Sequence, residues 1–146
     1  MYLLVDSTVW IDYFHGTVTP QTDFLDRALG WYYIAVGDLI HAEVLAGYLD
    51  ERERELAEKA LSQFRRLPLV GFEISRVAAR NSRILRAKGL PAPDLLECLI
   101  ATFAIENGWS LLHDSPGYEP FEQHLGLKVP DLSPANIFRG MVSPLG

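Results

Sequence analysis

The sequence predicts a single α/β domain whose central, mostly parallel sheet of four to five short strands is flanked by helices on both faces. Short apolar runs of strand length alternate along the chain with segments of helical periodicity, a pattern typical of parallel sheets covered by helices. The chain has 146 residues and is 49% hydrophobic, which is the size and apolar content of one compact domain with its own core.

The first half of the chain supplies two strands and three helices. Thr19 and Pro20 are residue types typical of an N-cap and a first helical position, and Gly30 is a typical helix stop. Asp38 is expected to cap the next helix. The predicted elements are a buried strand at 2–5, a short helix at 9–14, a helix at 20–29, a strand at 33–36 and a helix after Asp38.

The second half continues the alternation. The charged segment from Asp50 to Leu67 is amphipathic, with one apolar side formed by Leu56, Ala60, Leu61 and Phe64. The further predicted elements are a weak strand at 67–70, helices at 72–88 and 94–107, a strand at 109–113 and a last short strand at 127–129. We expect one domain over residues 1–132 and an irregular C-terminal tail over 133–146.

Composition limits the classes of function. There are 13 Lys and Arg against 19 Asp and Glu, a net charge of -6, which disfavours binding of duplex nucleic acid by bulk electrostatics but leaves a nuclease possible. Cys98 is the only cysteine and is expected to be a core residue. The chain has no apolar run of about 18 residues and no signal peptide pattern. These features predict a cytoplasmic protein without a membrane partner.

Acidic residues stand where a parallel sheet gathers its ligands. In open α/β sheets, ligands bind beyond the carboxyl ends of the strands. Asp6 and Asp114 directly follow predicted strands, and Glu43 lies in the helix after the second strand. Asp94 and Glu97 open the helix that leads to the last main strand. We therefore expect four or five carboxylates to converge on one rim of the sheet.

Several of these acids also have simpler interpretations. Asp6 and Asp94 are each of a residue type favoured at helix N-caps, and Asp114 precedes a Ser-Pro-Gly turn. Glu43 and Glu97 lie among apolar neighbours, where a surface role is a poorer explanation.

Clustered carboxylates need a cation, because close like charges disfavour ionisation. Mg²⁺ or Mn²⁺ takes carboxylate and water oxygens, whereas four scattered histidines and one cysteine disfavour zinc. Such a site favours metal-assisted hydrolysis of a phosphodiester. The sequence has neither a Gly-rich phosphate loop nor a G-x-S-x-G elbow.

Basic residues recur on the helix at 72–88. Arg76, Arg80 and Arg83 are spaced to form one stripe. This stripe is interpreted either as a contact for RNA phosphates or as a solvated helix face.

Four motifs resemble one family. They are LLVDSTVWIDYF, GDLIHAEVLAG, ECLIATFAIENGWSLLH and YEPFEQHLGLKV, and they span residues 3 to about 129. Their order and spacing resemble PIN-domain ribonucleases, specifically VapC-like toxins of bacterial type II toxin-antitoxin systems. The resemblance implies a PIN domain whose acids bind Mg²⁺ or Mn²⁺ and hydrolyse RNA. It also implies a cognate VapB-like antitoxin protein as partner, in a homodimer or a toxin-antitoxin hetero-oligomer.

The resemblance also implies a site. By position, Asp6 corresponds to the family's first acid, Glu43 to the second and Glu97 to the third, which is usually Asp. These three residues are the expected metal ligands and, with Asp114, the expected catalytic residues; Ser7 and Asp94 are expected to be auxiliary. Arg76, Arg80 and Arg83 are possible RNA contacts because of their helical spacing and not because of the resemblance.

The chain departs from the family pattern after the last strand. When His113 and Tyr118 are aligned, Ser115 and Gly117 stand where the usual acids would be, and Asp114 lies one residue early. Glu97 is longer than Asp by one methylene, and Mg²⁺ demands near-ideal octahedral geometry. The alternative prediction is therefore a weakened or inactive PIN-domain protein that binds an antitoxin or RNA without cleavage.

Overall fold

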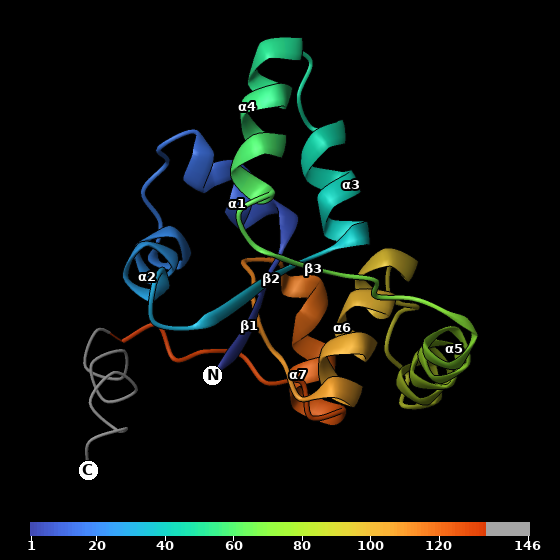
Figure 1. Cartoon of the computed structure of the whole chain (residues 1–146). Coiled ribbons are helices and arrows are strands. Elements are labelled where there is room, and N and C mark those ends of the chain that lie inside the picture. The colour runs from blue at the N-terminus through green and yellow to red at the C-terminus, as the bar shows by residue number, and fades with distance from the viewer. Residues whose placement is uncertain (134–146) are drawn as a thin grey trace.

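A four-stranded parallel sheet forms the centre of the computed structural model, which describes residues 1–133 (Figure 1). The strands are ordered β3-β2-β1-β4, and every neighbouring pair is parallel. Their bounds are β1 (Tyr2–Val5), β2 (Tyr33–Gly37), β3 (Arg65–Leu67) and β4 (Ser110–Leu112). The predicted fold class is confirmed. The predicted tail lies, from residue 134 onward, outside the described residues.

Helices cover the sheet on two sides. Figure 1 shows α1 to α4, in blue to green, gathered on one side, and α5 and α6 on the other. The bounds are α1 (Ser7–Phe14), α2 (Pro20–Ala28), α3 (Asp38–Ala46), α4 (Glu51–Leu61), α5 (Phe72–Ala87), α6 (Leu95–Asn107), η1 (Pro116–Tyr118) and α7 (Glu119–His124). The sequence did not predict η1 or α7.

The strand order explains this arrangement. The chain steps from β1 to β2 to β3 in one direction and then returns across the sheet to β4. Because crossovers between parallel strands are right-handed, opposite steps place their helices on opposite faces. The connection that follows β1 and the connection that precedes β4 therefore lie on opposite faces of the sheet. The switch point between these two strands is the position where α/β folds bind ligands.

Local signals formed the elements largely as expected. Leu3, Leu4 and Val5 of β1 are fully buried, as befits a strand covered on both faces. The Thr19 hydroxyl accepts from the backbone N–H of Thr22 in a complete capping box. Gly108 ends α6 in the left-handed region, at φ 72°, which glycine adopts without steric cost.

Three predictions around β3 were wrong. Gly37, not Asp38, is the N-cap of α3; the Asp38 carboxylate instead accepts from the backbone N–H groups of Leu39 and Leu69, at 2.8 and 3.0 Å. The helix after Asp50 ends at Leu61 rather than Leu67. The strand predicted at 67–70 is formed by Arg65–Leu67. β3 is an edge strand that pairs through its backbone, and the polar side chains of Arg65 and Arg66 give no apolar run from which a strand would be predicted.

The buried side of α4 also differs from the prediction. Leu56 is 59% exposed, whereas Ala57 and Leu61 are buried. The apolar spacing fits both faces, and only packing against α3 selects one. The strand predicted at 127–129 is reduced to one isolated bridge between Ser110 and Lys128.

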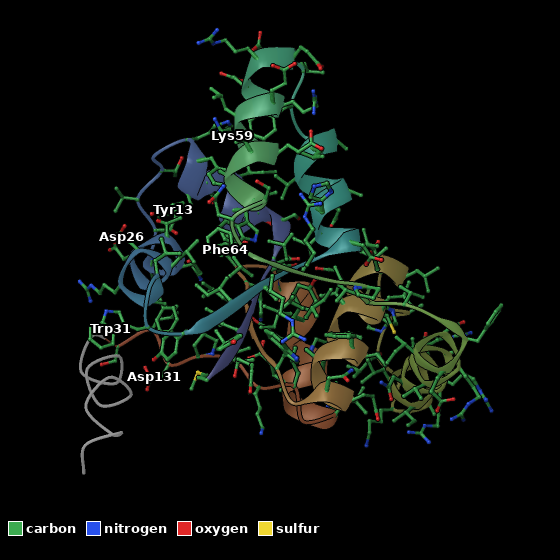
Figure 2. The ribbon with its side chains drawn as sticks, in the orientation of Figure 1. Tyr13, Asp26, Trp31, Lys59, Phe64 and Asp131 are labelled. Carbon is green, nitrogen blue, oxygen red and sulfur yellow. The ribbon has the colours of Figure 1, made fainter. Side chains whose placement is uncertain are left out.

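Polar contacts join neighbouring helices. Figure 2 shows Tyr13 of α1 and Asp26 of α2 close together, where the Tyr13 hydroxyl donates to the Asp26 carboxylate at 3.1 Å. Between α5 and α6, Asn81 donates to the Thr102 hydroxyl at 3.0 Å. Cys98 is buried in the core, as predicted. Over the described residues, no helix is long and apolar enough to cross a membrane.

Candidate functional site

Asp6 lies at the switch point between β1 and β4. It follows β1, is 5% exposed, and its backbone N–H donates to the carbonyl of Leu112 at 2.9 Å. Its carboxylate accepts a hydrogen bond of 3.1 Å from the hydroxyl of Tyr118, the last residue of η1. The end of the first strand and the segment after the last strand therefore meet at this carboxylate.

The carboxyl of Asp6 is electrostatically disfavoured as an anion. Burial above all, and then the negative charges of Glu43 and Glu97, raise its pKa to about 7. The backbone N–H of Ser7 and the Tyr118 hydroxyl offset part of this rise. Asp6 stands at the N-cap position of α1, but its side chain makes no capping hydrogen bond, so capping does not account for this residue.

Glu43 reaches the same region from α3. Burial raises the pKa of its carboxyl, the Ser7 hydroxyl lowers it through a hydrogen bond, and the charges of Asp94 and Glu97 raise it again. Ser7 is itself buried. The structure therefore brings Asp6, Glu43 and Glu97 into electrostatic contact, with Ser7 between two of the elements that carry them.

Glu97 projects from the first turn of α6 toward the segment after β4. The Ser115 hydroxyl donates to Oε2 of Glu97 at 2.7 Å. A Cβ atom placed on Gly117 would lie only 2.3 Å from Oε1 of the same carboxylate. Glu97 thus occupies space beside the two positions where the family pattern places acids.

Asp94 caps α6, as its simpler interpretation proposed. Its carboxylate accepts from the backbone N–H of Glu97 at 3.0 Å, and the residue is exposed. Its charge also raises the pKa of Glu43, so Asp94 lies close enough to influence the acids.

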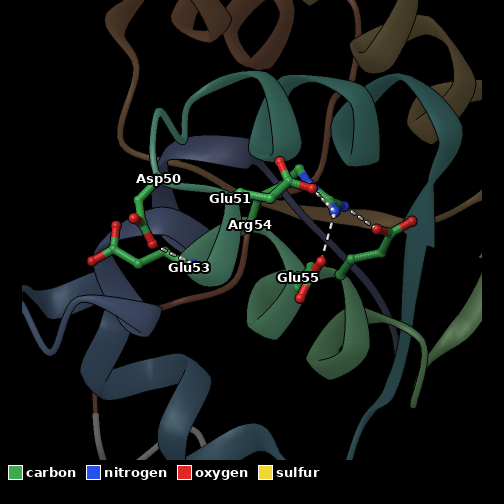
Figure 3. Close-up of polar contacts among 6 residues, drawn as sticks. Asp50, Glu51, Glu53, Arg54 and Glu55 are labelled. Carbon is green, nitrogen blue, oxygen red and sulfur yellow. Dashed lines mark hydrogen bonds and ion pairs between the residues drawn. The ribbon is translucent and has the colours of Figure 1, made fainter.

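Replacing Asp94 by alanine is expected to destabilise the protein by about 1 kcal/mol, because an N-cap is lost. Asp50→Ala is a matched control, since the Asp50 carboxylate accepts from the backbone N–H of Glu53 at 2.9 Å (Figure 3). We expect similar losses in urea unfolding, with weaker Mn²⁺ binding only for Asp94→Ala. Equal Mn²⁺ affinities in the two variants would make Asp94 a cap and nothing more.

Asp114 differs from these acids in its surroundings. It is exposed and lines a cleft of about 320 Å³ with residues that include Gln21 and Glu122. The charges of Glu43 and Glu97 raise the pKa of Asp6, and those of Asp94 and Glu97 raise the pKa of Glu43; the charge of Asp114 is in neither set. The predicted assistance of Asp114 in catalysis stays a prediction without support from this geometry.

Three residues at the site were not among the predicted ones: Ser115, which bonds Glu97, and also Gly117 and Tyr118. Tyr118 is buried and bonded to Asp6, and the absence of a side chain at Gly117 leaves room for Glu97. The available signal was their place in the segment that aligns with the family's acids. Their contacts join residues far apart in the sequence, which local patterns do not reveal.

The arginines of α5 are exposed. Arg76 forms an ion pair with Glu73 at 2.6 Å, and the positive charge of Arg80 helps Arg76 to lower the pKa of Glu73. Part of the predicted basic stripe is therefore neutralised within the helix, and the stripe's role in RNA binding stays a prediction.

The donor set fits a hard divalent ion. Three carboxylates and two serine hydroxyls are oxygen donors, and the charges acting on buried Asp6 are both negative. Mg²⁺ is commonly held by one or two carboxylates while it keeps several waters. Among residues 1–133, no group of three or more acidic, histidine or cysteine side chains is arranged so that it could hold a metal ion as it stands. What the chain offers a divalent ion is therefore the chemistry of its oxygen donors.

The fold and the acidic rim define a known class. The family model described as PIN domain matches residues 3–115, so the chain belongs to the PIN domain family. It is 27% identical over 119 residues to VapC ribonuclease Mb1587 of Mycobacterium bovis, covering 80% of this chain and 89% of that protein. The same figures hold for Ribonuclease VapC11 of Mycobacterium tuberculosis.

Solved structures show the same fold. The crystal structure of VapBC2 from Rickettsia felis, bound to a promoter DNA fragment, aligns with a TM-score of 0.72 at 16% identity, covering 89% of this chain and 98% of that chain. FitAcB from Neisseria gonorrhoeae aligns with a TM-score of 0.68 at 15% identity, over 89% and 97% of the two chains. VapBC-1 from nontypeable Haemophilus influenzae gives 0.67 at 15% identity, over 90% and 98%.

Proposed function

We propose that this PIN-domain protein is a VapC-type endoribonuclease toxin that uses Mg²⁺ or Mn²⁺. The observation that carries the proposal is the convergence of Asp6, Glu43 and Glu97 from three separate elements on one rim, where their charges act on one another. Ionising such a group is unfavourable unless a cation is present. The names of the relatives from Mycobacterium supply the reaction class.

Each residue of the site has a distinct role in the proposed reaction. Asp6, Glu43 and Glu97 would hold the ion, Ser7 orients Glu43, and Tyr118 fixes the rotamer of Asp6 by its hydrogen bond. A bound divalent ion supplies positive charge that polarises an RNA phosphodiester and activates water for its hydrolysis. Misplacement of any of these carboxylates by about 1 Å is expected to reduce cleavage strongly.

The test uses the purified chain freed of any antitoxin, a defined RNA pool and Mn²⁺. We expect cleavage products that disappear when EDTA is added. Cleavage that persists in EDTA would contradict metal-assisted hydrolysis, and a parallel pool of DNA substrates would detect a DNA nuclease.

A second function is favoured by the loop after β4. Ser115 and Gly117 replace acids there, and in residues 1–133 no group of three or more acidic, histidine or cysteine side chains is arranged to hold a metal ion. Both observations fit a protein that binds an antitoxin or RNA without cutting it. Normal complex formation with no products in Mn²⁺ would establish this alternative over the first.

The exposed arginines of α5 are proposed to contact RNA phosphates. Arg80→Ala and Arg83→Ala are each expected to weaken RNA binding for all sequences and to reduce the salt dependence of binding by about 1 in slope. Arg52→Ala on α4 is the matched control, because Arg52 is an exposed helix residue distant in sequence. Equal effects of the three substitutions would assign the stripe to a solvated face.

A VapB-like antitoxin protein is the proposed partner, because two of the solved structures are VapBC complexes by name. Apolar side chains are available for such a partner where α3 and α4 leave Leu49 and Leu56 exposed, beside a cleft of about 330 Å³ lined in part by Phe14 and Tyr48. Assembly as a homodimer or as a toxin-antitoxin hetero-oligomer, and a cytoplasmic location, stay predictions.

A further inference from the structure

Three departures from the family pattern meet at one point in the structure. Glu97 stands where the family usually has the shorter Asp, and Ser115 and Gly117 stand where it usually has acids. The Ser115 hydroxyl donates to Oε2 of Glu97 at 2.7 Å, and the Oε1 atom lies 2.3 Å from the position that a Cβ of residue 117 would take. Changes that look like separate losses in the sequence are therefore in direct contact.

The Glu97 carboxylate occupies the space that a side chain at position 117 would take. Real Cβ atoms essentially never approach another atom within 3.0 Å, yet a Cβ at 117 would be within that distance of both Oε1 and Cδ of Glu97. The backbone itself does not demand glycine, because Gly117 is not among the positive-φ glycines. Any side chain at this position would displace the Glu97 carboxylate.

Ser115 fixes the same carboxylate from a constrained position. Its hydroxyl accepts from the backbone N–H of Gly117 at 3.2 Å while it donates to Glu97. Its backbone N–H donates to Nδ1 of His113 at 3.1 Å, and Nε2 of His113 lies 2.9 Å from Glu122 on α7. Gly117 of η1 thereby holds the Ser115 hydroxyl, and His113, which follows β4 and contacts α7, holds the Ser115 backbone, so the hydroxyl is a directed donor.

The segment 115–118 forms hydrogen bonds with two of the acids. Ser115 at its start bonds Glu97, and Tyr118 at its end bonds Asp6 at 3.1 Å. We propose that Ser115 and Gly117 are positioning residues that place the longer acid Glu97 at the metal site, so that α6 supplies the carboxylate while the segment after β4 supplies the space and the hydroxyl. This inference rests on the proposed metal-dependent function and adds to it how Glu97 reaches the ion.

A double-mutant cycle between Gly117→Ala and Glu97→Asp tests the proposal. Mn²⁺ affinity is measured by isothermal titration calorimetry, and the melting temperature of the metal-free protein reports folding. In the Glu97 protein we expect Gly117→Ala to weaken Mn²⁺ binding by about 10-fold. In the Glu97→Asp protein it should have little effect, because the shorter side chain no longer fills that space.

Ser115 provides an independent arm. Ser115→Ala is expected to weaken Mn²⁺ binding by about 10-fold with little change in melting temperature, whereas Ser115→Thr keeps the hydroxyl and the affinity. Ser62→Ala is the control, since Ser62 is an exposed serine whose hydroxyl bonds only a local carbonyl, that of Lys59. This arm decides the proposal even if Gly117→Ala fails to fold.

The outcomes separate the two levels of inference. Mn²⁺ binding by the unchanged protein with additive effects of Gly117→Ala and Glu97→Asp, or with no loss in Ser115→Ala, would overturn the positioning role alone. A folded, unchanged protein that binds no Mn²⁺ would overturn the proposed function and this inference with it.

Discussion

Asp6→Asn and Glu43→Gln are each expected to reduce RNA cleavage by about 100-fold or more. Each substitution keeps the size of the side chain and removes one of the negative charges that act on each other at the rim. An amide oxygen is a weaker ligand for a hard cation than a carboxylate oxygen. The measurement is the initial rate of cleavage of a defined RNA by antitoxin-free protein in Mn²⁺.

Matched controls carry the same chemical changes on exposed helix positions. Asp23→Asn on α2 and Glu106→Gln on α6 alter exposed acids, so they are expected to cleave RNA at the unchanged rate. The assignment of Asp6 and Glu43 to the metal site would fail if either site variant, folded by circular dichroism, kept cleaving at the rate of its control.

The metal-free protein is expected to lose stability as the pH rises from about 4 to about 7. Burial and the neighbouring acids raise the pKa of Asp6 from 3.8 to about 7 in the folded chain. Below about pH 4 the carboxyl is protonated in both states. Between these two pKa values only the unfolded chain ionises, so the folded state becomes relatively less stable, and above about pH 7 the loss is complete. The raised pKa of Glu43 acts in the same direction.

Thermal unfolding in EDTA, followed at about pH 6 and about pH 8, measures this effect. Asp6→Asn should melt at a higher temperature than the unchanged protein at about pH 8, and the difference should shrink at about pH 6. Mn²⁺ should raise the melting temperature of the unchanged protein at the higher pH and leave that of Asp6→Asn nearly unaltered. A buried Asp6 that stabilises the fold as an anion would give the opposite order at about pH 8.

Together the two predictions distinguish a functional carboxylate from a structural one. Replacing a structural acid lowers the stability of the protein. This is the result expected for Asp94 and Asp50, because each caps a helix. The Asp6→Asn protein is instead expected to be more stable than the unchanged protein at about pH 8 and to be less active. That combination is characteristic of sites where electrostatic strain is retained for function.

The acids themselves could be predicted from the sequence to different degrees. Asp6 and Glu43 follow from strand ends and from the family motifs, and Glu97 follows from the register of the helix after it. Asp94 was correctly weighed as a cap, because capping depends on only three residues of local sequence. Asp114 was grouped with the rest because it follows a strand, yet it is exposed and its charge is not among those that raise the pKa of Asp6 or Glu43. Position in the sequence does not fix the direction in which a loop residue points.

The sequence by itself determined the alternating α/β plan, the strand of Tyr2–Val5, the caps at Thr19 and Asp94, the stop at Gly108 and the family. These features depend on hydrophobic periodicity and capping within a few residues, which act before the chain is packed. Only the tertiary structure decided that Arg65–Leu67 forms the edge strand, that Leu56 stays exposed, and that Ser115, Gly117 and Tyr118 close around Glu97 and Asp6. Each of these outcomes depends on contacts between segments that are distant in sequence, and those contacts exist only once the sheet has brought the ends of β1 and β4 together.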